Sequence, residues 1–428
     1  RLTGMPPFEA IGKGLTEQGF IWGIHDELAK SGTWGVGYNS LRFDDEVTRF
    51  TLWRNFYDPY AREYSQGNSR WDLIDVVRCF FALRPDSLTW PRRPDGAPSF
   101  KLEALTAANG LEHGAAHDAM SDVTATLALA RALRDADTEL FDELLSLRFR
   151  ARIEAMIDTH AMTPLVHVSG LLGTERACLG VIVPLAPHPE LKSDVICADL
   201  SREPHFLSMT SEEIKARLFA KSTDLVSPDD RPSLMTIKVN KAPVLLPMSH
   251  ITPAIAARLG LGGEQLRQNL RLLRDTKKNQ GSAFTEHLQT VYRGRTPVID
   301  SNPDTALYGA FVPNSDRSLV QEVQSSSPAE LRDRSFVFTD PRLPELLFRY
   351  RARNWPDLLT EQEQALWRDF CKEQWLQGDH LTISQFNAAL ADEQASDELT
   401  DKQQSALADL ARWVAENAKV LGLSAASV

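Results

Sequence analysis

The spacing of hydrophobic and polar residues predicts alternating helices and strands in the first third of the chain. Residues 16–31 have a helical pattern, and "TWGVGYN" (Thr33 to Asn39) is a short apolar segment that ends in turn-forming residues. That segment predicts a strand that runs into a loop. A helix is expected from Phe43, because Phe43, Val47 and Phe50 recur at helical spacing.

Two later stretches also predict helices. The first is "RWDLIDVVRCFFAL", and the second is "MSDVTATLALARAL". The second places Met120, Val123, Leu127 and Ala130 on one face. Residues 1–138 therefore read as an α/β domain.

The pattern changes after a helical bridge. Short β-branched segments separated by Gly, Pro and Asn predict a small antiparallel sheet or barrel in residues 139–292; they are "PLVHVSG", "CLGVIVPLA", "DVICADL" and "MTIKVNKAPVLL". The capping box Thr210-x-x-Glu213 announces a helix within it. Residues 293–428 are helical and acidic, with capping boxes at Thr360-x-x-Glu363 and Thr400-x-x-Gln403, so a closing helical domain is expected.

Composition narrows the class of protein. The 428 residues are 43% hydrophobic and 25% charged, as in globular proteins, and the net charge of −11 argues against a wholly basic nucleic-acid binder. It leaves room for an enzyme that holds DNA in a local basic groove. The four cysteines form no C-x-x-C pair, which indicates a reduced compartment. No apolar run approaches the ~20 residues of a membrane span and no signal peptide is recognisable, so a cytoplasmic protein is expected.

The stretch "AHDAMSDV" joins a histidine to an acidic helix start. Residues five apart on a helix point about 140° away from each other. His117 and Asp122 can therefore converge only if His117 lies in the loop before the helix. The aspartate could then bind a metal while the histidine takes a proton from a metal-bound water. A capping or solvated histidine is the alternative, and His113 with His117 has the i, i+4 spacing of a zinc pair but lacks the intervening glutamate.

A second carboxylate group opens the helix that follows the first strand. In "GYNSLRFDDEVTRF", Asp44 and Asp45 are placed where negative charge is favourable against the helix dipole, so simple capping is the alternative interpretation. The glycine cluster "GLGG" (Gly260 to Gly263) lacks the third glycine of a dinucleotide-binding fingerprint, because Gln265 stands there. A nucleotide-dependent oxidoreductase is therefore discarded.

Taken together, "NSLRFDDE" and "PSFKLEALTAANGLEHGAAHDAMSD" resemble the second and third motifs of the DEDD exonucleases, ribonuclease H-like 3′→5′ nucleases, in their histidine-bearing branch. "RNFYDPYA", "NSRWDL", "ALRPD", "HVSG" and "LLFRYRARNWP" extend the resemblance to the bacterial exonuclease I family over nearly the whole chain. The resemblance implies three parts. They are a ribonuclease H-like exonuclease domain that is incomplete at its N-terminus, an SH3-like β-barrel domain and a C-terminal helical domain.

The resemblance also implies the chemistry. Asp44 matches the second-motif aspartate, Asp122 the third-motif aspartate, and His117 the general base. The family hydrolyses phosphodiesters with two Mg²⁺ ions, for which Mn²⁺ can substitute, and degrades single-stranded DNA to mononucleotides in repair and recombination. The family's first motif, D-x-E on an apolar strand, has no credible counterpart here. The chain as it stands is therefore expected to be almost inactive and the full-length protein active.

Contacts with DNA and with partners complete the expectations. Single strands are held by aromatic stacking and by basic side chains. The candidates for DNA binding are Arg49, Arg70, Trp71, Phe100, Lys101 and Arg351. The resemblance implies a channel enclosed by the three domains, docking onto the acidic tail of the single-stranded DNA-binding protein, and no membrane contact; a monomer is the simplest expectation. A catalytically incomplete scaffold that only binds single-stranded DNA is the alternative.

Overall fold

The computed structural model describes residues 7–111, 119–227, 230–294, 300–378, 380–395 and 399–423. Its internal contacts divide the chain into two units. Unit 1 comprises Arg1–Lys30, Glu46–Arg62 and Val298–Val428, and unit 2 comprises Ser31–Asp45 and Glu63–Pro297. Unit 1 combines segments that are distant in sequence, because early helices pack against closing ones: α2 (Glu17–Leu28) contacts α16 (Leu343–Asn354). The three consecutive domains stay a prediction from the sequence.

Unit 2 begins with a parallel pair of short strands, β1 (Trp34–Gly37) and β2 (Ser69–Asp72). The predicted strand before Asn39 is confirmed as β1. The helix predicted for "RWDLIDVVRCFFAL" starts only at Leu73, as α5 (Leu73–Leu83), because Asp72 caps it: the Asp72 carboxylate accepts the Ile74 N–H at 3.0 Å. The three residues before it belong to β2.

Four further helices follow in unit 2: α6 (Leu102–Ala108), α7 (Ala119–Ala136), α8 (Thr138–Ser146) and α9 (Arg150–Met156). α7 contacts α5, α6 and α8. Leu129 and Leu133 of α7 are fully buried, whereas Met120, Val123 and Leu127, which share one face, are exposed. A helix with apolar residues all round does not reveal from its own sequence which stripe its neighbours cover.

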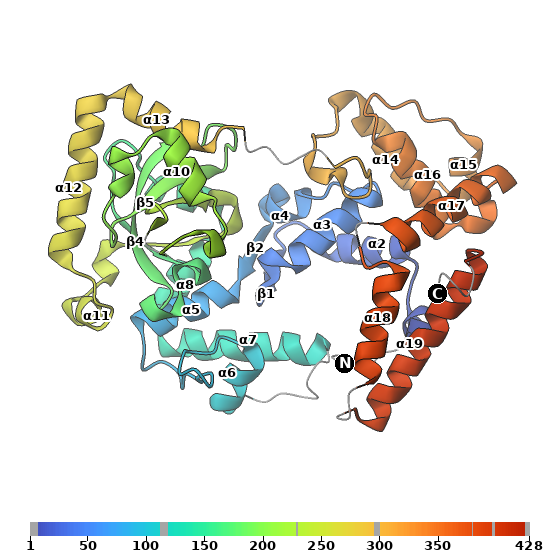
Figure 1. Ribbon diagram of the computed structural model, residues 1–428, viewed down its shortest axis with the longest axis horizontal. Helices are drawn as coiled ribbons and strands as arrows, with labels where there is room; N and C mark the ends of the chain where they lie inside the picture. Colours follow the sequence, from blue (N-terminus) through green and yellow to red (C-terminus); the bar gives the residue numbers. More distant parts are fainter. Residues whose placement is uncertain are drawn as a thin grey trace. The chain divides into compact units, whose positions relative to one another are not determined.

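The rest of unit 2 is built on a five-stranded antiparallel sheet with the order β6-β5-β4-β3-β7 (Figure 1). The strands are β3 (Leu165–Val168), β4 (Leu179–Pro187), β5 (Asp194–Asp199), β6 (Leu234–Lys238) and β7 (Val244–Pro247). This confirms the predicted antiparallel sheet. Its helices are α10 (Ser211–Leu218), α11 (Pro253–Arg258), α12 (Gly263–Gln280) and α13 (Ser282–Tyr292); α13 packs on β4 and α10. Phe206, Phe284 and Leu288 are fully buried in this core.

Unit 1 is helical in its described residues, as predicted for the closing region. Besides α2 and α16 it contains α1 (Pro7–Lys13), α14 (Arg317–Ser325), α15 (Pro328–Asp333), α17 (Glu361–Gln377), α18 (Ile383–Gln394) and α19 (Asp401–Val420). The capping boxes at Thr210, Thr360 and Thr400 are all formed. Each satisfies two backbone N–H groups that the helix start leaves without a helical partner.

Two short helices span the boundaries between the units. α3 covers Asp44–Arg54 and α4 covers Ala61–Tyr64. The start of α3 confirms the helix predicted from Phe43. Its buried residues include Leu52 and Trp53, whereas Phe43 and Val47 are exposed. In unit 1, Trp53 packs in a cluster with Leu343, Leu346 and Tyr350 of α16.

Candidate active site

The loop between β1 and α3 presents Asp44. Asn39 adopts a left-handed backbone with φ of +61°, a single turn of 3₁₀ helix covers Ser40–Arg42, and Asp44 is the first residue of α3. Partial burial raises the pKa of the Asp44 carboxyl, and the neighbouring Asp45 charge adds to this, while a backbone hydrogen bond lowers it. Because these surroundings disfavour the charged form of the Asp44 carboxylate, a bound metal ion would stabilise that form.

The second candidate carboxylate, Asp122, lies in the first turn of α7 in unit 2 and is exposed. His117, and the alternative zinc pair His113 and His117, lie outside the described residues. Within the described part of the chain, no group of three or more His, Cys, Asp or Glu side chains could hold a metal ion. Asp44 and Asp122 together supply hard carboxylate oxygens near helix starts, a donor type that suits Mg²⁺.

Arg70 and Trp71, expected to bind DNA, are both buried. The Arg70 guanidinium pairs with Asp45, pairs with Glu63 at 2.9 Å and donates to the Asn240 carbonyl at 2.9 Å. The Trp71 indole lies in the core and donates to the Leu144 carbonyl at 3.2 Å. These contacts favour a structural role for both residues.

Phe100 and Lys101 lie just before α6. The Phe100 ring is half-buried and packs edge-on against Phe81, with ring centroids 5.4 Å apart. Its backbone carbonyl accepts a hydrogen bond from the Tyr38 hydroxyl at 2.6 Å. Lys101 is exposed. Of this pair, Lys101 has the solvent access that contact with a DNA phosphate requires.

Arg49 of α3 belongs to a polar and aromatic cluster in unit 1. It is only 4% exposed, and its Nη1 lies 2.7 Å from Glu46 and 3.4 Å from the Tyr308 hydroxyl. Its guanidinium also lies 5.6 Å from the Tyr60 ring centroid. Through these contacts the buried Arg49 side chain stabilises the positions of the Glu46, Tyr60 and Tyr308 side chains.

Beside this cluster lies Phe311, whose ring centroid is 6.4 Å from that of Tyr60 and whose surface is 86% exposed. An exposed phenylalanine next to a second ring is the kind of surface on which a nucleic-acid base stacks. Sequence reasoning missed Tyr308 and Phe311. The available signal was two aromatics among turn-forming residues in "YGAFVPN".

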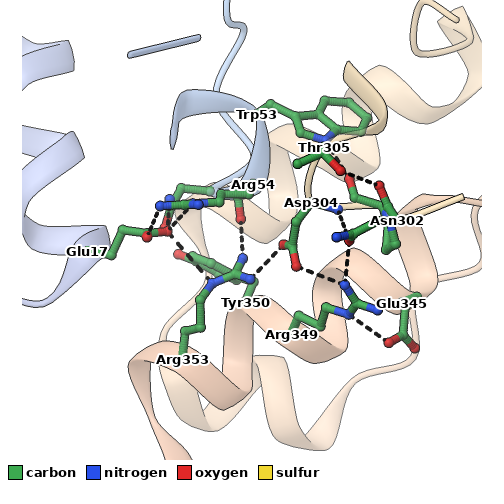
Figure 2. Close-up of polar contacts among 12 residues, drawn as sticks. Glu17, Trp53, Arg54, Asn302, Asp304, Thr305, Glu345, Arg349, Tyr350 and Arg353 are labelled. Carbon is green, nitrogen blue, oxygen red and sulfur yellow. Dashed lines mark hydrogen bonds and ion pairs between the residues drawn. The ribbon is translucent and has the colours of Figure 1, made fainter. Parts of the chain in front are cut away.

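The arginines of "FRYRARNW" are engaged within unit 1. Figure 2 shows Arg349 and Arg353 of α16 converging on Asp304, at 2.9 Å and 2.6 Å. Arg353 also donates to the Arg54 carbonyl at 3.1 Å, and the Arg54 side chain pairs with Glu17. This network, Glu17–Arg54–Arg353–Asp304–Arg349, ties α2, α3 and α16 together.

Arg351, the residue of this stretch expected to contact DNA, pairs with Glu363 of α17 at 2.7 Å. Its side chain is 15% exposed. The basic run that looks like a nucleic-acid contact in sequence is therefore largely neutralised by carboxylates of its own unit.

The family models that match the chain define it as an exonuclease with two accessory domains. A family model described as "Exonuclease" matches residues 8–130, one described as "Exonuclease I SH3-like domain" matches 148–294, and one described as "Exonuclease I C-terminal domain" matches 301–417. The fold class expected from the sequence is thereby confirmed.

Curated relatives identify the family. The chain is 40% identical over 383 residues to exodeoxyribonuclease I of Escherichia coli strain K12. The matched residues cover 88% of this chain and 79% of that protein. It is 38% identical over 374 residues to exodeoxyribonuclease I of Haemophilus influenzae, covering 86% and 78% of the two chains. The chain belongs to the exodeoxyribonuclease I family, which confirms the resemblance.

Solved structures agree. The E. coli exonuclease I complex with a dA16 oligonucleotide superposes with a TM-score of 0.89 at 36% identity, covering 97% of this chain and 87% of that one. The enzyme from Methylocaldum szegediense gives 0.91 at 36% identity and the same coverage. Among other similar structures are a zinc-bound form of an E. coli ExoI–ssDNA complex and an ExoI/SSB-Ct complex, each at 37% identity. None of the helices described in our structure is long and apolar enough to cross a membrane.

Proposed function

We propose that this protein degrades single-stranded DNA from its 3′ end to mononucleotides, as a phosphodiester hydrolase of DNA repair and recombination. The observation that carries the proposal is the 40% identity to an exodeoxyribonuclease I over 88% of the chain. Structures of relatives with bound oligonucleotides support the substrate. The scaffold alternative is less favoured, because the relatives that match are named as enzymes.

The proposed chemistry assigns a task to each candidate residue. Asp44 and Asp122 hold divalent cations, two Mg²⁺ ions with Mn²⁺ as a substitute. When bound, these ions make the attacking water more acidic and stabilise the leaving 3′ oxygen. His117 takes a proton from that water, which requires a neutral imidazole near pH 7. The zinc-bound form of a relative's structure supports dependence on a divalent metal ion.

Substrate and partner contacts follow from the exposed groups. Lys101 pairs with a phosphate, and Phe311 stacks with a base beside the ring of Tyr60. The acidic tail of the single-stranded DNA-binding protein is the proposed protein partner, supported by the ExoI/SSB-Ct complex of a relative. We place the enzyme in the cytoplasm, where its DNA substrate would be, and as a monomer.

The test is digestion of a 5′-labelled single strand by the protein in the presence of Mg²⁺. Asp44→Asn, Asp122→Asn and His117→Ala should each lower kcat at least 100-fold. Asp135→Asn, which removes another exposed carboxylate of α7, should leave it unchanged.

Equal loss of activity in Asp135→Asn, or full activity in Asp44→Asn, would contradict the site. DNA binding without hydrolysis would instead support the scaffold alternative. EDTA should abolish hydrolysis, and addition of Mg²⁺ should restore it.

A further inference from the structure

The loop that presents Asp44 is tightly folded. A Cβ atom added at Gly37, where β1 ends, would lie 2.5 Å from the Ser40 Cβ, so the chain turns there too closely for any side chain. Leu41, within the same loop, is buried. A loop with this packing can fix the position of Asp44, which follows it, if hydrogen bonds also fix the loop backbone.

One carboxylate holds that backbone. Asp72, the last residue of β2, accepts the N–H groups of Asn39 at 2.7 Å and Leu41 at 3.1 Å. It also accepts the Ile74 N–H at the start of α5. Asp72 is only 8% exposed, and its burial raises its pKa although three backbone N–H groups act in the other direction. One side chain therefore ties the β1–α3 loop to β2 and to α5.

A second residue of β2 holds the other side of Asp44. Arg70 lies two positions before Asp72, so both side chains leave the strand on the same face, and Trp71 between them enters the core. The Arg70 guanidinium pairs with Asp45, the residue next to Asp44, and is itself fixed by Glu63 and by the Asn240 carbonyl. The segment 39–45 is thus fastened on both sides of Phe43 and Asp44.

We propose that Arg70 and Asp72 are positioning residues for the hydrolysis. Together they fix the loop, and so the position in which the Asp44 carboxylate binds the metal. This rests on the proposed function, in which Asp44 is a metal ligand. A displacement of about 1 Å in a reacting group can cost on the order of 100-fold in rate. Loss of the contacts of either residue should therefore weaken metal binding. The affinity for DNA, which depends on other residues, should stay the same.

The test compares Asp72→Ala and Arg70→Met with Asp137→Ala. Asp137 is a matched control, because it too caps a helix, accepting the Leu140 N–H at 2.9 Å, and pairs with an arginine, Arg84, but it does not touch the loop. The first readout is amide hydrogen exchange of residues 37–45. It should accelerate at least tenfold in the two β2 variants and not in the control.

The second readout is the Mn²⁺ concentration that gives half-saturation, measured by the electron paramagnetic resonance of free Mn²⁺ and by hydrolysis of the single strand. It should rise at least tenfold in Asp72→Ala and Arg70→Met, with KM for DNA unchanged. Asp72→Asn keeps one acceptor oxygen, so it should recover part of the loss and stays informative if Asp72→Ala fails to fold.

Unchanged Mn²⁺ dependence in a variant whose loop exchanges faster would overturn the positioning role. Unchanged loop exchange would overturn it as well. Failure of the proposed function gives a different pattern, in which Asp44→Asn itself leaves Mn²⁺ binding and hydrolysis as they were.

Discussion

Replacing Asp304 with alanine tests how much the arginine network of Figure 2 contributes to the stability of unit 1. The Asp304 carboxylate is shared between Arg349 and Arg353, and the three side chains are 15%, 10% and 17% exposed. Removing one partner of a buried ion pair costs about 3–5 kcal/mol, mostly because a charge is left buried and unpaired.

The remaining contacts of the two arginines lower this expected cost. Arg349 keeps Glu345 at 2.9 Å and the Asn302 side-chain carbonyl at 2.7 Å, and Arg353 keeps the Arg54 carbonyl. Both guanidiniums also keep some contact with water. We therefore expect a loss of about 2–3 kcal/mol, which corresponds to roughly 30- to 160-fold faster exchange of the α16 amides.

Hydrogen exchange read by mass spectrometry is the appropriate assay, because a chain with two units need not unfold in one step. Peptides from α16 should show the acceleration, while peptides from β4 in unit 2 serve as the internal control. In a double-mutant cycle, Arg353→Met should cost less in the Asp304→Ala background than alone. Acceleration below about threefold in α16 would contradict the expected loss, since the carboxylate would then contribute no more to stability than an exposed pair.

Four other outcomes are expected. Phe311→Ala should weaken single-strand binding by about 5- to 150-fold in fluorescence anisotropy, the value of one stacked base, without loss of stability; unchanged affinity excludes the stacking role. Lys101→Ala should reduce the slope of log affinity against log salt by about 0.7, the value for one phosphate contact, and an unchanged slope would contradict that contact. Burial lowers the pKa of His167, so the unfolded chain binds more protons below pH ~6.5 and stability should fall with acidification by up to about 1.4 kcal/mol per pH unit; urea titrations of His167→Gln should show a flatter profile. Phe206→Ala removes a ring with no exposed surface and should cost about 3–5 kcal/mol in the same titrations, whereas a loss under 1 kcal/mol would indicate that the core collapses around the gap.

The misassigned stretch "RWD" shows where local reasoning stops. Arg70, Trp71 and Asp72 continue a helical pattern in sequence, but they form a strand because β1 pairs with them from 35 residues upstream, as Trp34 does with Ser69. Strand formation here depends on a partner that the local sequence does not contain. The same applies to α7, whose buried face is set by the helices that surround it.

Features with local causes, or with residues that match a family motif, can be predicted from the amino-acid sequence alone. Capping boxes need only four consecutive residues, the antiparallel strands carry their own β-branched pattern, and Asp44 and Asp122 stand in motifs that can be matched without coordinates. Which charged side chains are buried and paired depends on the tertiary fold. Arg49 and Arg70 look like solvated cations in sequence, yet the fold buries them against Tyr308 and Asp45, 259 and 25 residues away. Burying a charge is tolerable only with a partner. Arg49 has Glu46 three residues away, whereas only chain folding brings Arg70 to Asp45.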